Sequence, residues 1–268
     1  MPIIMLPDPD IACASCRKAL IHPLRCSGCL LVAYCDSACQ RIHWKAGHKT
    51  TCKAGGSKVF SEMLHRATEG SISDMFNVGA FLFSGAGVTK DVPEAMRWFL
   101  RAAEAGHADS QCNIANAYKE GDGMPKDITK AVYWFQKAAA RGHADAQFSL
   151  GVIYDLGDGV AKNEEEAARL FRKAAESGHV AAQCNLACGY ACGTGLPVDM
   201  VEAVRWFKAA AAGGDANAQC ALARCFREGQ GVPRDAAAAE SWLRAAAAQG
   251  HPEALSILAE QAAGSGGK

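Results

Sequence analysis

Eight residues of the kinds that bind metal ions lie within the first 52 positions and fall into four couples. Two couples have CxxC spacing, a third has three residues between its cysteines, and the last has that same interval between a histidine and a cysteine. CxxC places two thiolates on one tight turn, and the longer interval places two ligands on one turn of a helix. Eight ligands are what two tetrahedral zinc ions require. In chain order the couples are Cys13 and Cys16, Cys26 and Cys29, Cys35 and Cys39, and His48 and Cys52.

Metal binding is the expected source of stability for this segment. About 40 residues cannot bury enough apolar surface to offset their own ordering entropy. The alternatives are a disulfide cluster, or reduced cysteines with no common role. Because protein side chains fill all eight positions, neither ion keeps an open position for water, and we expect two structural zinc ions rather than a hydrolytic centre.

The start of the chain bears on the compartment. The opening MPIIMLPDPD has no basic leader, and its prolines and acids interrupt the apolar patch before a signal-peptide core forms. No apolar run approaches the roughly 20 residues that span a bilayer. We therefore expect a cytoplasmic or nuclear protein with no signal peptide or transmembrane segment, where thiols stay reduced and cysteine clusters bind metal.

The series CASC, CSGC, YCDSACQ, Trp44 and HKTTC resembles the MYND zinc finger over residues 13–52. The resemblance implies that the couples interleave, so that the first and third hold one zinc and the second and fourth hold the other. By this similarity Cys13, Cys16, Cys35 and Cys39 bind the first ion, and Cys26, Cys29, His48 and Cys52 bind the second.

Fingers of this family bind proline-rich peptide segments, and the resemblance implies a groove formed by Ser37, Gln40 and Trp44. An exposed indole offers a flat apolar face to proline rings, and a glutamine can hydrogen-bond an extended backbone. Trp44 alternatively caps the small core between the zinc ions, and the two roles are compatible.

A basic surface on the finger raises the alternative of nucleic-acid or chromatin contact. Residues 1–53 carry seven Lys or Arg against three acids, although the whole chain has 28 of each. The thiolate-rich zinc sites are themselves anionic and cancel about half of this positive charge. Aromatic residues interleaved with the basic ones for base stacking are lacking, so we regard nucleic acid as an unlikely partner.

A strict period of 36 residues follows residues 53–57, KAGGS, which we expect to be a flexible linker. Trp98 begins a series that continues at Trp134, Leu170, Trp206 and Trp242, and three glycine positions recur in the same register. Such a period is the signature of a repeat architecture. Each unit reads as two helices joined by a GxG turn, with small residues where helices approach closely.

The second helix of each unit is expected to begin at an Asp or Asn whose side chain caps the first turn. Three units have a Glu three places later, as a capping box prefers. The caps are Asp91, Asp127, Asn163, Asp199 and Asp235, and the glutamates are Glu94, Glu166 and Glu202.

The repeated pattern AxxxLGxxYxxGxGVxxDxxxAxxWFxKAAExG resembles the Sel-1-like repeat, a relative of the tetratricopeptide repeat, over residues 58–263. The implied fold is all-α, a right-handed α-solenoid of helix pairs preceded by the small two-zinc finger. We expect an N-terminal extension at 1–12, half-repeat caps at both ends of the array, and a C-terminal tail at 264–268. The full repeats are expected at 73–108, 109–144, 145–180, 181–216 and 217–252.

The six cysteines of the repeats are expected to be core fillers rather than ligands. Cys112, Cys184 and Cys220 share a phase with two phenylalanines. Cys184, Cys188 and Cys192 are spaced four apart and could form a thiol stripe, but buried packing is the favoured interpretation. The histidines that recur after the helix-ending glycines are expected to be placed by the repeat, not by a shared metal.

The sequence favours an adaptor over an enzyme. It contains no GxSxG, no phosphate-binding loop and no HExxH. The finger is expected to bind a proline-rich segment, and the concave face of the repeats a second protein, with no membrane partner. The alternatives are nucleic-acid contact by the basic finger, and a purely structural finger that caps the array.

Overall fold

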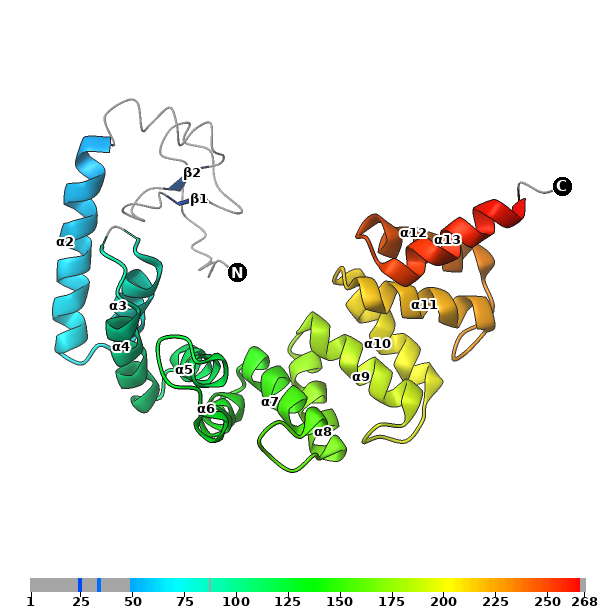
Figure 1. Ribbon diagram of the computed structural model, residues 1–268, viewed down its shortest axis with the longest axis horizontal. Coiled ribbons are helices and arrows are strands. Elements are labelled where there is room, and N and C mark those ends of the chain that lie inside the picture. The colour runs from blue at the N-terminus through cyan, green and yellow to red at the C-terminus, as the bar shows by residue number, and fades with distance from the viewer. Residues whose placement is uncertain (1–23, 26–32, 35–48, 87, 266–268) are drawn as a thin grey trace. The chain divides into compact units, whose positions relative to one another are not determined.

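The computed structural model describes the backbone of residues 24–25, 33–34, 49–86 and 88–265, and the chain divides into two compact units, residues 1–125 and 126–268 (Figure 1). In the first unit the helices are α2 (Lys49–Thr68), α3 (Ile72–Ser84), α4 (Val92–Glu104) and α5 (Ala108–Glu120). In the second they are α6 (Ile128–Ala140), α7 (Ala144–Leu156), α8 (Glu164–Glu176), α9 (Val180–Cys192), α10 (Met200–Ala212), α11 (Ala216–Glu228), α12 (Ala236–Ala248) and α13 (Pro252–Ser265). The predicted α-solenoid of helix pairs is confirmed.

One short strand pair accompanies the helices in the described part of the chain. Strands β1 (Leu24–Arg25) and β2 (Ala33–Tyr34) pair antiparallel, with Leu24 opposite Tyr34 and Arg25 opposite Ala33. In an antiparallel pair the chain leaves the two strands at opposite ends. The two described strands therefore run in opposite directions.

The predicted linker at residues 53–57 is wrong, because these residues lie inside α2. Two glycines cost a helix about 1 kcal/mol each relative to alanine, which is the reason KAGGS reads as a joint. The cost is offset by tertiary packing further along the same helix. Phe60 contacts Phe81 of α3 with ring centroids 6.0 Å apart, and Met63 and Ala67 are buried.

The second helix of each repeat begins as predicted. The side-chain oxygens of Asp91, Asp127, Asn163, Asp199 and Asp235 each accept the backbone N–H three residues later at 2.9–3.1 Å. The same helices end before a glycine of positive φ, from +82° to +94°, and the following amide returns to a carbonyl five residues earlier. This is the Schellman arrangement that satisfies the last carbonyls of a helix.

The capping boxes predicted from Glu94, Glu166 and Glu202 are wrong. Each glutamate pairs with an arginine three residues later instead of reaching back to the cap. The backbone N–H of the cap is already satisfied, since it donates to a carbonyl near the end of the preceding helix at 2.8–2.9 Å, as Asn163 does to Tyr154. The reciprocal bond of a capping box therefore has no open donor.

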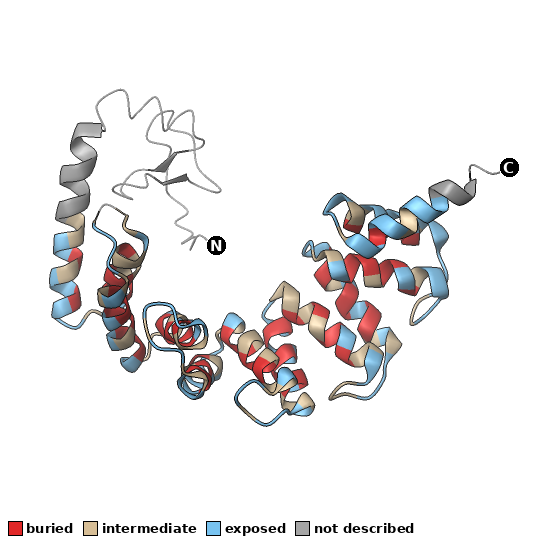
Figure 2. Cartoon of the chain, in the orientation of Figure 1, coloured by how far each residue is buried: buried red, intermediate tan, exposed pale blue. Residues whose placement is uncertain are grey.

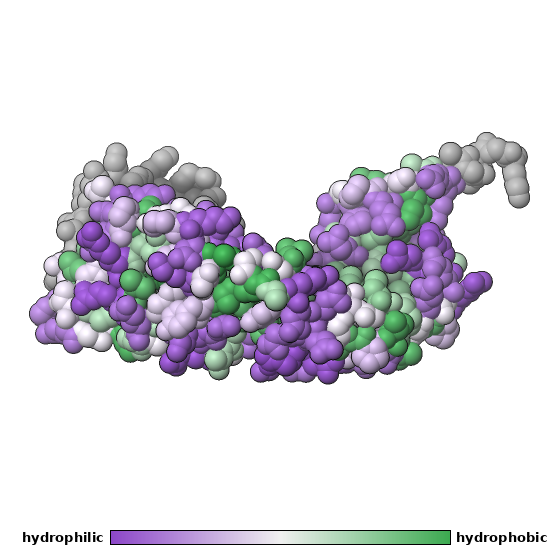
Figure 3. Space-filling model, turned by 60° about the horizontal axis from the view of Figure 1, so that its bottom comes forward, coloured by the Kyte–Doolittle hydropathy of each residue, from purple (hydrophilic) through white to green (hydrophobic). Residues whose placement is uncertain are grey.

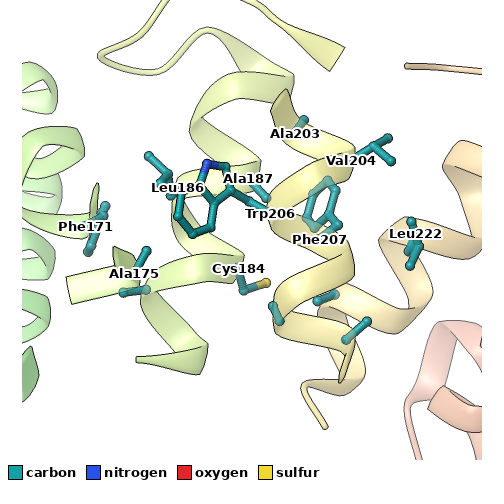
Figure 4. Packing of buried hydrophobic residues seen from close by; sticks show 14 of the residues in the cluster. Phe171, Ala175, Cys184, Leu186, Ala187, Ala203, Val204, Trp206, Phe207 and Leu222 are labelled. Carbon is teal, nitrogen blue, oxygen red and sulfur yellow. The ribbon is translucent and has the colours of Figure 1, made fainter. Parts of the chain in front are cut away.

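Buried side chains line the surfaces between helices, and exposed ones cover the outer surfaces (Figure 2). The alanines that share one phase of the repeat are fully buried, and they leave room for larger side chains from neighbouring helices. In the second unit, Trp206 and Phe207 of α10 belong to one cluster with Leu186 of α9 and Leu222 of α11 (Figure 4). The buried alanines are Ala102, Ala138, Ala174, Ala210 and Ala246.

The second glycine of the GxG turn sets how closely successive repeats approach. Gly195 has φ +66°, and a Cβ there would overlap the carbonyl group of Glu164 at the start of the preceding second helix. Gly231 bears the same relation to Met200. Only glycine allows this backbone-to-backbone contact, so the turn is an interface element as well as a connection.

Candidate functional site

The predicted finger residues lie largely outside the described residues. This holds for the ligands Cys13, Cys16, Cys26, Cys29, Cys35, Cys39 and His48, and for the groove residues Ser37, Gln40 and Trp44. Cys52 is the exception, because its backbone belongs to the first turn of α2. The last predicted zinc ligand is therefore on the helix that packs against the first repeat.

A partly buried ion pair connects the other end of that helix to α3. Arg66 of α2 donates two hydrogen bonds, each 2.9 Å long, to the carboxylate of Asp74 on α3. These bonds hold the pKa of Asp74 below its ordinary value, and Ser71 adds a third hydrogen bond at 2.6 Å. Bidentate pairs of this kind fix orientation as well as adding energy, so this pair orients α2 against the first repeat.

The recurring histidines cap the first helix of each repeat, a role that the sequence analysis missed. Nδ1 of His143 and of His179 accepts the backbone N–H three residues later at 3.1–3.2 Å. Asp215 does the same with a carboxylate oxygen at 2.8 Å. The replacement of His by Asp at one repeat was the available signal, because aspartate is a preferred N-cap residue.

These histidines also link neighbouring repeats, as His179 shows. The ring of His179 stacks on Phe148 with centroids 4.5 Å apart, and its Nε2 lies 3.4 Å from a carboxylate oxygen of Asp145. Because Nδ1 accepts a hydrogen bond, Nε2 carries the proton in this arrangement. One ring thus caps its own helix and contacts the preceding repeat.

Three exposed polar residues in the second unit lie against aromatic rings of the following repeat. Arg172 lies 5.7 Å from the ring centroid of Tyr190 and donates a 2.7 Å hydrogen bond to its hydroxyl oxygen. Lys208 lies 5.6 Å from the ring centroid of Phe226. Gln136 donates to the Tyr154 hydroxyl at 3.3 Å. We call these six residues the cation–aromatic row: Gln136, Tyr154, Arg172, Tyr190, Lys208 and Phe226.

The two cations of the row differ from two arginines on the same helices, which are paired with carboxylates. Arg169 and Arg205 form ion pairs with Glu166 and Glu202 on their own helices, and Arg169 lowers the pKa of Glu166. Within the described residues, Arg172 and Lys208 have no carboxylate at ion-pair distance. The row therefore presents two cations on partly buried aromatic rings, an arrangement suited to acidic groups. Its signal in the sequence was the 36-residue spacing of both its aromatic and its polar members.

Apolar side chains on the surface form separate patches between hydrophilic ones on the face shown in Figure 3. In the second unit the most exposed large ones are Leu156, Val198 and Val201, each at least 64% exposed. Leu156 ends α7, whereas the two valines flank the start of α10. Small apolar patches are ordinary on folded proteins and do not by themselves identify a binding site.

The prediction that the thiol stripe is buried is wrong for two of its three cysteines. Cys184 is buried, as are Cys112 and Cys220, which confirms these three as core fillers. Cys188 and Cys192 are exposed. Each four-residue step advances the side chain by about 40° around a helix, so a stripe that begins on the buried face turns toward solvent within two steps.

Comparison with known proteins agrees with this organisation. The family model described as MYND finger matches residues 13–52, and the one described as Sel1 repeat matches residues 73–107, 108–143, 144–179, 180–215 and 216–251. Both are typical protein–protein interaction modules, and a MYND finger binds zinc. None of the described helices has the length and apolar character needed to cross a membrane.

Curated relatives match through the finger alone. Ubiquitin C-terminal hydrolase 15 of Oryza sativa subsp. japonica is 49% identical over 41 residues, which is 15% of this chain and 4% of that protein. Protein-lysine N-methyltransferase SMYD4 of Gallus gallus is 33% identical over 48 residues, or 18% of this chain and 6% of that protein. The chain thus spans only a small part of the length of these relatives.

Solved structures match through the repeats. A Sel1 repeat protein from Oxalobacter formigenes is 34% identical with a TM-score of 0.65, covering 70% of this chain and 75% of that one. The protective antigen c5321 of uropathogenic Escherichia coli is 27% identical with a TM-score of 0.71, covering 85% of this chain and 52% of that one. The chain therefore belongs to the Sel1 repeat family and carries a MYND finger ahead of its five repeats.

Proposed function

We propose that the protein is a non-catalytic adaptor that joins two protein partners, one at the finger and one at the repeats. The observation that carries the proposal is the combination of a MYND finger with five Sel1 repeats, both of them interaction modules. Helix α2 supports it further, because this helix begins at Lys49 and packs against α3. In this proposal the finger leads directly into α2 and not into a flexible linker.

The finger, in this proposal, holds two structural zinc ions. Cys13, Cys16, Cys35 and Cys39 hold one, and Cys26, Cys29, His48 and Cys52 hold the other. The antiparallel pair of β1 and β2 supports the interleaved assignment. Cys26 directly follows β1 and Cys35 directly follows β2, and the two strands run antiparallel, which is compatible with the two cysteines belonging to different metal sites.

The finger partner is a proline-rich segment bound by Ser37, Gln40 and Trp44. Anisotropy of a labelled proline-rich peptide with the full chain tests this assignment. Trp44→Ala and Gln40→Ala should each weaken binding at least tenfold, whereas His43→Ala, the matched neighbour outside the groove, should bind as the wild type does. Unchanged affinity in both groove variants, with zinc content intact, would refute the assignment.

The repeat partner is a protein segment rich in acidic residues, bound along the cation–aromatic row. Arg172 and Lys208 lie one repeat apart, each against a ring of the next repeat, so acidic side chains of an extended segment meet a cation at regular intervals. This contact steers association and weakens with salt. The predicted use of the concave face of the array remains part of this proposal.

A charge-reversal pair tests the repeat surface. Arg172→Glu with Lys208→Glu should abolish binding of an acidic probe peptide, such as an alternating Glu and aromatic sequence. Lys126→Glu with Lys130→Glu changes the net charge by the same amount on the same unit but away from the row, and should retain most of the binding. Equal losses in the two pairs would mean that binding depends on net charge and not on the row.

The proposed setting is the cytoplasm or the nucleus. Cys188 and Cys192 are exposed thiols, and exposed thiols persist in reducing compartments. No catalytic step is assigned to the chain in this proposal.

A further inference from the structure

Three side chains of different metal-binding types meet at the C-terminal end of the second unit. Ligand atoms of Cys220, His251 and Glu253 all lie within 4.8 Å of one another. Cys220 is in the second turn of α11, His251 directly precedes α13, and Glu253 is in the first turn of α13. The group therefore joins the last full repeat to the helix that covers it.

Equivalent positions in the second unit show what is particular about this group. Phe148 of α7 stacks on His179, and its aromatic ring fills the space beside the imidazole. At the equivalent position of α11 the residue is Cys220, so a thiol stands in place of the ring. A cavity of about 270 Å³ adjoins the thiol and is lined by Cys220 and Glu253 together with Leu243 and Ile257. The thiol and the carboxylate therefore border the same open space.

The hydrogen bonds of His251 leave one nitrogen weakly engaged. Its Nε2 lies 3.2 Å from the side-chain oxygen of Asn217, whereas its Nδ1 accepts the Ala254 N–H at 3.4 Å, longer than the 3.1–3.2 Å of the other histidine caps. A histidine bound to a metal ion commonly donates its second ring N–H to an oxygen acceptor. Asn217 is placed as that acceptor, and the long bond from the Ala254 N–H is the one that the Nδ1 lone pair would exchange for a metal ion.

We propose that Cys220, His251 and Glu253 form a zinc site that clamps α13 to α11. One sulfur, one nitrogen and one oxygen ligand are a donor set that Zn²⁺ accepts, with solvent at the fourth position. Tetrahedral bonds of about 2.0–2.3 Å place ligands roughly 3.5 Å apart, so small side-chain rotations close the set. The proposal is independent of the adaptor function.

The electrostatics of the thiol are consistent with metal-dependent ionisation. Burial raises the pKa of Cys220, and the nearby Glu253 carboxylate raises it further, while Arg224 and Arg227 act in the opposite direction. A divalent cation between the thiol and the carboxylate removes their repulsion and stabilises the thiolate. Binding of zinc should therefore release a proton.

Zinc content of the full chain, measured by mass spectrometry after equilibration in zinc-buffered solution, tests the site. The finger contributes equally to every variant, so the difference between variants reports this site alone. Cys220→Ser should hold one zinc per chain fewer than the wild type. Cys184→Ser removes an equally buried thiol from the same phase one repeat earlier, and should hold as much zinc as the wild type.

A second variant keeps the test valid if loss of the buried thiol disturbs the array. His251→Asn retains a side-chain oxygen that can cap α13 but removes the imidazole, and it should also lose one zinc. Replacement by Co²⁺ should give a thiolate-to-metal absorption band that is weaker in Cys220→Ser by the share of one thiolate. The proposal requires a loss in both site variants and none in Cys184→Ser, and any other pattern overturns it.

Discussion

At the scale of single residues, the same position in successive repeats is filled by different side chains that perform one task. His179 and Asp215 have different shapes and charges, yet each accepts the backbone N–H three residues later, in the first turn of the following helix. Helix caps are satisfied by any short acceptor in this geometry. The position of the acceptor atom therefore matters more for capping than the identity of the residue. For this reason a series of histidines at the repeat interval does not by itself indicate a metal site.

Replacement of His179 tests this reading. His179→Ala removes the cap, the contact with Asp145 and the stack on Phe148, and should lower the free energy of unfolding by about 1–2 kcal/mol in urea denaturation. His179→Asn keeps a capping oxygen and should recover about half of that loss. Equal losses in the two variants would show that the cap contributes little and that the ring stack dominates.

A second residue-scale prediction concerns the reactivity of Cys188. A hydrogen bond from the Cys184 thiol, and then the positive charge of Arg224, lower the pKa of Cys188 from 9.0 to about 7. The thiolate is the nucleophile, so the alkylation rate of this exposed residue should rise with pH through a midpoint near 7. Peptide-resolved mass spectrometry after timed iodoacetamide labelling gives that midpoint.

Variants of the two neighbours separate the causes of this shift. Cys184→Ala should move the midpoint of Cys188 upward toward the ordinary thiol range, and Arg224→Ala should move it upward by less. Cys192→Ala, one turn further along α9, serves as the control and should leave it in place. A midpoint that stays near 7 in Cys184→Ala would contradict the assigned hydrogen bond.

At the scale of elements, the GxG turn shows how a loop sets the distance between helices. Gly195 and Gly178 both have positive φ, at +66° and +86°, but only Gly195 lies against the backbone of the preceding repeat. Comparing these two positions separates two reasons why a glycine is needed. One is a backbone dihedral angle that other residues adopt only with strain, and the other is the lack of space for a Cβ atom.

Alanine at these two positions should give unequal effects. Gly178→Ala should lower the free energy of unfolding by about 1 kcal/mol, because only the left-handed backbone is strained. Gly195→Ala adds a clash with the preceding repeat to that strain, so it should lower the free energy of unfolding by about 3 kcal/mol or more in total. Urea denaturation followed by circular dichroism measures both. Similar losses would mean that the repeats shift without cost and that the contact does not set their separation.

Element boundaries were predictable where a side chain fixes them and not where packing does. The caps from Asp91 to Asp235 have short acceptors at a fixed interval, and all five proved correct. The linker at 53–57 was misread because two glycines dominate local propensity, whereas the contact of Phe60 with Phe81 depends on chain folding. Likewise Glu166 follows the capping-box pattern, but a neighbouring helix already satisfies the amide it would bind.

At the scale of the whole molecule, the repeat period predicted the fold because each unit meets only its neighbours. A strict interval of 36 residues means that one interface is repeated. The candidate sites differ in this respect. The predicted zinc couples follow from local spacing, whereas the cation–aromatic row joins residues 18 positions apart on different helices, as Arg172 and Tyr190 are. Such pairs become visible only when the repeats are stacked.

Removal of zinc should have effects confined to the places where metal is assigned. Cys52 lies in the first turn of α2, and Gly55 and Gly56 weaken the turns that follow it. Once its metal is lost, this end of the helix keeps only marginal local stability.

Hydrogen exchange of the chelated full chain should therefore increase at residues 49–57, and also at the start of α13 where the further zinc site is proposed. Amides in α8 and α10, which are held by the buried cluster around Trp206, should exchange as before. Faster exchange throughout α8 and α10 would contradict this confinement and would show that metal stabilises the whole array.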